Sequence, residues 1–351
     1  MSITPPKLKS ANWAQNSQVT LQHLVYLTDD RGIFEHAKGR RPRYSHGYCT
    51  DDNARLLVVA ARDKGHSLGS AVLGRIALRF LLDAQQPDGT THNRLGPTRT
   101  WQDDPGLDDA WGRSLWGLGT AAGSGTDTLL RHRGYEAFDR GCHHRAPSLR
   151  TMSYAALGAA EILRVDEDHA GAKSLLADTA DMIEAASTNE KWPWPEPRLT
   201  YANALIPDAL IASGDALSRG GTLRQGLDLL EWLVEIETYD GHFSVTPTGG
   251  RGPGDVHPSF DQQPIEVASI AEAAARAYRA TGEPMWLETV MQSVNWFLGE
   301  NDIGVPVLDS ESGGGYDGLE ADGVNANQGA ESTLSMVATM QHRTHLQPTV
   351  L

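Results

Sequence analysis

The sequence predicts an all-α fold, and more specifically an (α/α)6 toroid of about twelve helices, six inner and six outer. Helices with an apolar stripe on one side alternate with helices that are rich in Ala and Gly and apolar almost all round, as helices buried on every side are. Loops of about 20 residues, uncommon in compact domains unless functional, precede only the second kind. Alternation with a period of two, which is typical of strands, is almost absent.

Six stretches carry the one-sided stripe of an outer helix, and Val72, Ile76 and Phe80 show its spacing most clearly. We expect these outer helices at residues 17–28, 72–81, 126–139, 171–186, 222–237 and 284–298. The inner helices are expected to begin near Asp52, Asp109, Ser148, Asn203, Pro264 and Gly329. A single hairpin cannot bury an all-round apolar helix, whereas a closed ring of hairpins can. The sequence therefore predicts that the six inner N-termini surround one pocket.

The domain organisation follows from this plan. Residues 1–15 show no helical pattern and are expected to form a flexible N-terminal arm, while 16–351 are expected to form a single toroidal catalytic domain. At 351 residues the chain is long enough for two domains, but repeat-built single domains of this size are common.

Composition excludes several classes of partner. The net charge of −15 argues against nucleic acid or an anionic membrane surface. The N-terminal stretch MSITPPKLKSANW lacks the apolar core of a secretory signal, and no apolar run approaches the roughly 20 residues of a membrane span. Two cysteines are too few for a disulfide framework. We therefore expect a soluble, cytoplasmic protein.

The stretch GYCTDDNARLL, from Gly47 to Leu57, is the most informative. A loop rich in Gly, Pro, Arg and His runs into two acids, an Asn and an Arg at the start of a helix that is expected to be buried. Caps at helix N-termini explain one acid, because a carboxylate accepts from the unpaired N–H groups of the first turn. They do not explain the whole set, which favours a functional site.

Three strings in the chain, GYCTDDNAR, FDQQPIE and NQGAES, resemble a bacterial family of glycosidase-like proteins found alone or fused to retaining glycosyltransferases. The fold plan is similar to that of the six-hairpin glycosidases, and the resemblance runs from about Leu24 to Glu331. It implies a carbohydrate substrate, an oligosaccharide or glycoside, and a possible glycosyltransferase partner. This chain departs from the family where Asp108-Asp109-Ala110-Trp111 replaces Glu-Asp-Ser-His, and where Tyr201-Ala202-Asn203 replaces Tyr-Asp-Asn.

Glycoside cleavage needs one protonated carboxyl to protonate the leaving oxygen and one ionised carboxylate as base or nucleophile. The acids expected at the mouth of the ring are Asp51, Asp52, Asp108, Asp109, Glu196, Asp261, Glu266 and Glu331. We expect Asp52 to be the base or nucleophile, held ionised by Arg55. Glu196, in the string WPWPE, is expected to be the general acid because apolar rings raise a carboxyl pKa. Asp109 is the substitute for either role.

Rings and amides near the same loops are expected to bind the sugar, since flat rings stack on sugar C–H faces and amides read hydroxyl groups. Arg55 and Arg113 are expected to orient the acids. The residues expected to contact substrate are Asp51, Arg55, Arg113, Trp194, Tyr201, Asn203, Asp261, Gln262, Gln263, Glu266, Asn327, Gln328 and Glu331.

Other functions stay open at this point. A sugar-binding module without activity, assisting a transferase, would keep the rings and amides but would not need clustered acids. A phosphorylase would share the acids, and a toroidal sugar epimerase would use histidine bases, for which His36 and His46 are available. A zinc enzyme would need ligands such as Cys49, Cys142, His143 and His144, but no CxxC or HExxH spacing is present. We expect no metal and no cofactor.

Overall fold

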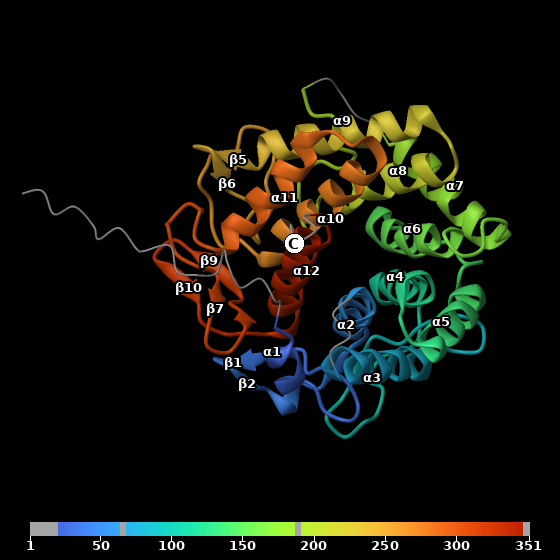
Figure 1. Ribbon diagram of the computed structural model, residues 1–351. Helices are drawn as coiled ribbons and strands as arrows, with labels where there is room; N and C mark the ends of the chain where they lie inside the picture. Colours follow the sequence, from blue (N-terminus) through green and yellow to red (C-terminus); the bar gives the residue numbers. More distant parts are fainter. Residues whose placement is uncertain (1–19, 64–67, 187–190, 347–351) are drawn as a thin grey trace, which may run out of the picture.

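A computed structural model describes residues 20–63, 68–186 and 191–346. Six inner helices form a closed ring in which each packs against the next, and the sixth returns to the first (Figure 1). They are α2 (Thr50–Arg62), α4 (Asp109–Ser124), α6 (Leu149–Leu163), α8 (Leu205–Ala216), α10 (Pro264–Thr281) and α12 (Ala330–Leu346). The predicted (α/α)6 toroid is confirmed.

The outer layer follows the same order around the ring (Figure 1). Its members are α1 (Gln22–Tyr26), α3 (Leu68–Ala84), α5 (Thr128–Gly141), α7 (Ala170–Glu184), α9 (Gly220–Ile236) and α11 (Pro284–Phe297). Residues 17–19 of the predicted first helix lie outside the described part of the chain. Within that part the helix begins at Gln22 and ends before the predicted Thr28, because the chain turns at Leu27 and forms a bridge between Thr28 and Ile33. The predicted arm at 1–15 lies outside the described residues, and the single-domain assignment stays a prediction.

The inner helices owe their close packing to small residues. A Cβ on Gly119 of α4 would lie 2.3 Å from the carbonyl oxygen of Gly158 on α6, and a Cβ on Gly158 would lie 2.2 Å from that of Leu115. No real side chain tolerates such distances, so these glycines allow the two backbones to touch. The Ala- and Gly-rich composition that identified the inner helices thus has a packing function.

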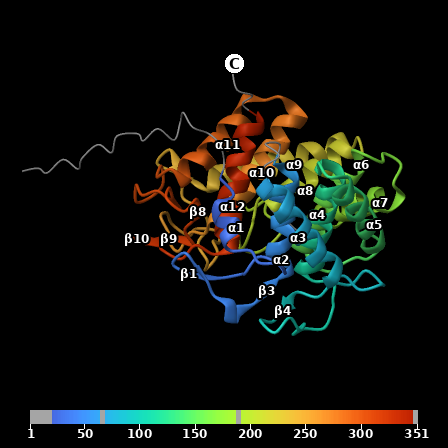
Figure 2. The ribbon, with the colours of Figure 1, turned by 60° about the horizontal axis from the view of Figure 1, so that its bottom comes forward.

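The long loops carry the few strands, which form five two-stranded antiparallel pairs among the described residues. The strands are β1 (Ala37–Lys38), β2 (Arg41–Pro42), β3 (Tyr48–Cys49), β4 (Arg94–Leu95), β5 (Thr238–Tyr239), β6 (His242–Phe243), β7 (Leu308–Asp309), β8 (Gly314–Gly315), β9 (Gly318–Glu320) and β10 (Gly323–Asn325). All of them precede inner helices, and Figure 2 shows most of them gathered along one side of the ring. That side holds the N-termini of the inner helices.

Buried ion pairs also join the inner helices to one another. The Arg62 guanidinium donates to both oxygens of Glu272, at 2.5 and 2.7 Å, and His342 Nε2 lies 2.8 Å from the same carboxylate. Arg276 Nε donates to Asp208 Oδ1 at 2.5 Å. These contacts connect α2, α8, α10 and α12 across the ring. No helix in the described part of the chain is long and apolar enough to cross a lipid bilayer.

The α4–α6 contact gives a direct test of the packing. Gly158→Ala should lower the free energy of unfolding by about 1–3 kcal/mol or more, because the added methyl meets fixed backbone. Gly221→Ala in α9 is the matched control, since nothing lies within 4 Å of its added Cβ. It should be neutral or stabilising by up to about 1 kcal/mol. Equal denaturant midpoints for the two variants would contradict the close-packing account.

Candidate active site

A polar cavity of about 370 Å³ opens at the N-terminal ends of α2 and α12 and beside the loops that precede α8 and α10. Five carboxyl groups, one guanidinium and several neutral polar groups line it. The lining residues are Glu35, His36, Cys49, Asp51, Asp52, Arg55, Tyr201, Gln263, Asp317, Asn325, Gly329, Glu331 and Ser332. Several elements of the ring thus contribute to one pocket, as the sequence predicts.

Arg55 is the centre of this site. It is 5% exposed, and its Nη1 donates to Asp52 Oδ1 at 2.7 Å. Its Nη2 contacts both Glu331 Oε2, at 2.7 Å, and the Tyr201 hydroxyl oxygen, at 2.5 Å. The Tyr201 hydroxyl in turn donates to Glu331 Oε2. One buried guanidinium therefore fixes residues from α2, α12 and the loop before α8.

Asp52 is buried, and opposing effects act on the pKa of its carboxyl group. The carboxylate is 2% exposed, and the Cys49 thiol donates to its second oxygen at 3.1 Å. Burial raises the pKa of Asp52 to about 7, although Arg55 acts in the opposite direction. Burial and the ion pair with Arg55 thus act in opposite directions on this carboxyl, and the expectation that Arg55 keeps Asp52 ionised stays a prediction.

The Asp51 side chain is more exposed than that of the neighbouring Asp52. Cys49 is the N-cap residue of α2, and no side chain caps that helix end, so Asp51 is not a cap. Its side chain is 23% exposed, its Oδ1 has no hydrogen-bond partner among the described residues, and Arg113 Nε lies 3.5 Å away. Burial raises the pKa of Asp51, and the charge of Glu331 adds to the rise. Of the two acids in the DD pair, Asp51 has the more exposed side chain, at 23% against 3% for Asp52.

Arg113 supports the site from α4. Its guanidinium lies 4.4 Å from the centre of the Tyr154 ring and 5.3 Å from that of Tyr201, so two aromatic faces hold it. It is 3% exposed and is not among the cavity-lining residues. Its predicted task of orienting an acid fits its position beside Asp51.

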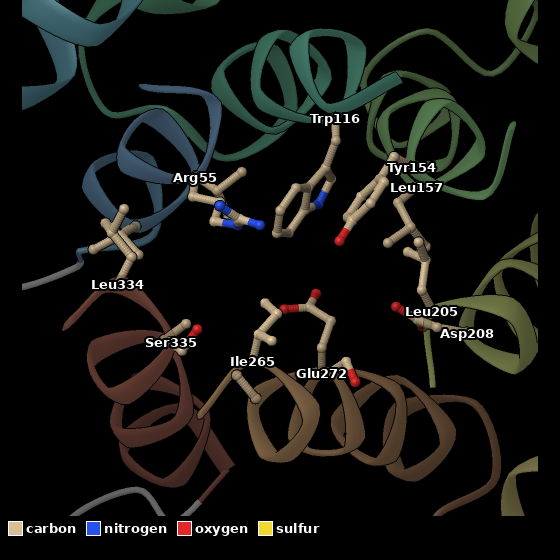
Figure 3. A pocket seen from close by; sticks show the side chains of 15 residues that line it. Arg55, Trp116, Tyr154, Leu157, Leu205, Asp208, Ile265, Glu272, Leu334 and Ser335 are labelled. Atoms are coloured by element: carbon tan, nitrogen blue, oxygen red, sulfur yellow. The ribbon is translucent and has the colours of Figure 1, made fainter. Parts of the chain in front are cut away.

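A second, mostly apolar cavity of about 50 Å³ lies inside the ring and is lined by all six inner helices (Figure 3). Figure 3 shows Arg55, Trp116 and Tyr154 pointing into it from one side and Glu272 from the opposite one. Arg55 lines both cavities and so forms the boundary between the polar mouth and the interior.

Five residues that the sequence predicts to contact substrate line the polar cavity, together with the predicted base or nucleophile Asp52: Asp51, Arg55, Tyr201, Gln263 and Glu331. Five others, Asn203, Gln262, Glu266, Asn327 and Gln328, have structural partners instead. Glu266 accepts from the backbone N–H groups of Ala202, at 2.5 Å, and of Asn203, at 3.1 Å, and also from the Asn203 amide at 2.9 Å. Burial raises the pKa of Glu266 to about 8. These contacts shape the loop that presents Tyr201.

The predicted amide contacts show the same pattern. Gln262 is fully buried and donates to Asp302 Oδ2 at 2.5 Å. Gln328 is 2% exposed and donates to Asp309 Oδ2 at 2.9 Å. Asn327 accepts from the backbone of Gly39 at 2.9 Å. These side chains order the long loops and do not line the cavity.

The prediction that Trp194 stacks on substrate is wrong. The ring is 1% exposed and stacks on Trp232 of α9, with the ring centres 6.0 Å apart, while Trp192 meets the same ring edge-on at 5.1 Å. The three rings form a hydrophobic cluster between the WPWP loop and the outer layer. A side chain this buried has no face left for a sugar.

Glu196 is also displaced from its predicted environment. Its Oε1 accepts from Arg150 Nη1 at 2.5 Å, and Arg150 also donates to the backbone carbonyl of Tyr201 at 2.6 Å. Glu196 does not line the polar cavity, because it is bound to this arginine and not held against apolar rings.

Asp109 and Asp261 do not line the polar cavity either. Asp109 accepts from the Thr151 hydroxyl at 2.6 Å, and Asp261 is exposed. Asp108 is the N-cap of α4.

The sequence-based prediction missed several lining residues. Asp317 lies in the glycine-rich loop before α12, where its Oδ1 accepts from the Gly329 backbone and the Ser332 hydroxyl, at 2.7 and 2.9 Å. Glu35 reaches the cavity from the first loop and pairs with Arg94. The position of Asp317, ten residues before the NQGAES string, was the only available signal.

The histidines and cysteines separate into different places. His36 lines the cavity, and its Nδ1 lies 3.1 Å from Nδ1 of His46. The four residues considered for zinc do not converge, since Cys49 bonds to Asp52 in the cavity and His144 Nε2 lies 2.6 Å from the Asp88 carbonyl.

No family model and no curated protein matches the sequence. Solved structures share the fold. A sugar epimerase from a ruminal bacterium has a TM-score of 0.69 at 11% identity, over 94% of this chain and 96% of that one. A D-mannose isomerase has a TM-score of 0.68 at 10% identity, over 98% and 100%. A family 9 endoglucanase has a TM-score of 0.58 at 14% identity, over 88% and 73%. At such identities the likeness shows the fold alone, and an association with glycosyltransferases stays a prediction.

The pKa of Asp52 gives a prediction with a definite sign. The folded state binds this proton more tightly than the unfolded chain, so the contribution of Asp52 to stability is full below pH 4 and is lost as the pH rises to about 7. Asp52→Asn should therefore flatten the fall of the unfolding free energy over that window, by on the order of 1 kcal/mol per pH unit. Denaturant titrations at several pH values measure this. Asp104→Asn, at an exposed position, is the control. If the free energy of unfolding depends on pH in the same way for the wild type and for Asp52→Asn, the raised pKa of Asp52 is contradicted.

Proposed function

We propose that the protein is a carbohydrate-active enzyme of the glycoside hydrolase class. The observation that carries this is the polar cavity at the inner-helix N-termini, in which five carboxyl groups surround one arginine. Such a pocket repels phosphorylated or otherwise anionic ligands and suits a neutral sugar, whose hydroxyl groups can donate to the acids. It also suits an oxocarbenium-ion-like transition state, whose positive charge the carboxylates stabilise.

The geometry favours Asp51 and Glu331 as the reacting pair. Asp51 combines a raised pKa with a partly exposed side chain at the cavity, as a general acid requires. Glu331 receives Arg55 and the Tyr201 hydroxyl on one oxygen, which leaves its other oxygen for the substrate or a water. Two donors on one oxygen stabilise the negative charge of a base or nucleophile. This pair replaces Glu196 and Asp109, while Asp52 acts through Arg55.

A second candidate is a sugar epimerase or isomerase, which abstracts a proton next to a carbonyl. The His36–His46 contact at the cavity favours it, because one histidine can abstract the proton from the sugar carbon and the other, once protonated, can return a proton to the opposite face. The solved structures of this fold include both an epimerase and an endoglucanase, so the fold does not decide between them.

One experiment separates the candidates. The protein is incubated in D₂O with a panel of di- and trisaccharides, with and without inorganic phosphate, and followed by NMR. The proposal expects a new reducing end with no deuterium on sugar carbon, with the anomer formed first reporting retention or inversion. A sugar phosphate formed only with phosphate would indicate a phosphorylase. Deuterium at the carbon next to the carbonyl, without bond cleavage, would overturn hydrolysis in favour of epimerisation.

The acid pair is tested on whichever substrate that panel identifies. Asp51→Asn and Glu331→Gln should each reduce turnover by about 10²–10⁴-fold, because each removes one proton-transfer or nucleophilic step. Wild-type turnover should fall as the pH rises, because Asp51 must be protonated to act. Glu196→Gln is the control and should stay within a few-fold of wild type. The assignment fails if Glu196→Gln loses as much activity as the other two.

A further inference from the structure

From the structure we infer a divalent transition-metal site, of the zinc type, on the outer layer at the end of α5. Its proposed ligands are Asp139, Cys142 and His143. One ligand atom from each of the three lies within 4.8 Å of the others. The site is independent of the polar cavity and of the function proposed for it.

The helix geometry explains why these residues meet. Asp139 is in the last turn of α5, Cys142 is the C-cap, and His143 follows it. Residues three and four positions apart share a face of a helix, so all three side chains can turn toward one point. The negative end of a helix dipole also lies there and favours a cation.

An independent contact places a fourth group at the same point. A Cβ built on Gly171, at the start of α7, would lie 2.5 Å from Cys142 Sγ and 3.3 Å from Cε1 of both His143 and His169. The thiol and both imidazole rings therefore pack against the Gly171 backbone at the start of α7, where no side chain separates them.

His169 acts as a positioning residue in this arrangement. Its Nδ1 accepts from the Ala172 backbone N–H at 3.1 Å, so the ring proton lies on Nε2, which faces Asp139 Oδ1 at 3.3 Å. His169 is only 6% exposed on its side chain, which fixes the ring. It thus orients the Asp139 carboxylate from α7, as partners of metal ligands commonly do.

The donor chemistry selects the metal. Thiolate, imidazole and carboxylate together are typical zinc ligands, and two negative charges neutralise a divalent cation. Ligands of tetrahedral zinc lie about 3.3–3.8 Å apart when their bonds are 2.0–2.3 Å long. His143 Nε2 lies 4.0 Å from Asp139 Oδ1, so small rotations of two exposed side chains close the shell. A water molecule would complete four-coordination.

A bound metal ion would connect the end of α5 to the start of α7 through Asp139 and His169. Because only the folded chain assembles the three ligands, bound metal should raise the melting temperature. Arg145 lies close by, but its guanidinium bonds to the Cys142 carbonyl and pairs with Asp178, at 2.9 and 2.7 Å, so its charge is partly compensated.

The test is calorimetric titration of ZnCl₂ into the reduced, chelator-treated full-length protein. The expected result is one equivalent bound, a raised melting temperature, and a thiolate-to-metal absorption band when Co²⁺ replaces zinc. Cys142→Ser should abolish the band. Loss of a residue that only orients a metal ligand typically costs about 10–100-fold in metal affinity. His143→Ala removes a ligand itself and should weaken zinc binding by more than this. The His143 side chain is 66% exposed, so this variant should fold.

His144→Ala is the matched control, because the neighbouring imidazole contacts Asp88 and not the ligand set. It should bind zinc as the wild type does. The proposal is overturned if the protein does not bind zinc, or if His143→Ala and His144→Ala bind zinc with equal affinity. It is also overturned if zinc binding survives Cys142→Ser and disappears in Glu331→Gln. The last would place the metal in the polar cavity.

Discussion

The burial of one positive charge at the mouth of the ring organises this protein. Arg55 sits on the first inner helix, and a buried guanidinium is costly unless opposite charges and acceptors compensate it, as they do here at both Nη atoms. Its partners come from the same helix, from the last inner helix and from the loop before the fourth. Because those elements are far apart in sequence, the contacts exist only when the ring is closed. The same interaction that completes the toroid therefore assembles the proposed catalytic carboxylates.

The mouth and the interior of the ring use charge differently. In the interior, Glu272 is matched by Arg62 and His342, and Asp208 by Arg276. At the mouth, carboxyl groups outnumber cations, and burial raises the pKa of several of them. An excess of buried carboxyl groups with raised pKa values costs stability, and proton transfer to a glycosidic oxygen requires such an arrangement. The excess of carboxyl groups at the mouth therefore supports the catalytic role proposed for it.

The fold could be predicted from sequence because its signal is local. Gly119 and Gly158 belong to helices that are small-sided and apolar all round, and only a ring buries such helices. Part of the site could be predicted for the same reason, since Asp51, Arg55 and Glu331 open inner helices. Trp194 could not be placed, because its partner Trp232 lies on another hairpin and nothing in the WPWP string shows which way the ring points. Asp317 was missed because a glycine-rich loop gives no periodicity that orients its side chains.

The central claim is that the carboxylates around Arg55 stabilise positive charge on a bound sugar. It is tested most directly by calorimetric comparison of neutral monosaccharides with cationic piperidine analogues of the same gluco, manno and galacto configurations. The account predicts that one cationic analogue binds at least about 10²-fold more tightly than its neutral counterpart, as transition-state mimics do. It also predicts that Glu331→Gln removes most of this preference while the protein stays folded. Equal affinity for the cationic and neutral forms in every configuration, or a preference that Glu331→Gln leaves intact, would contradict it.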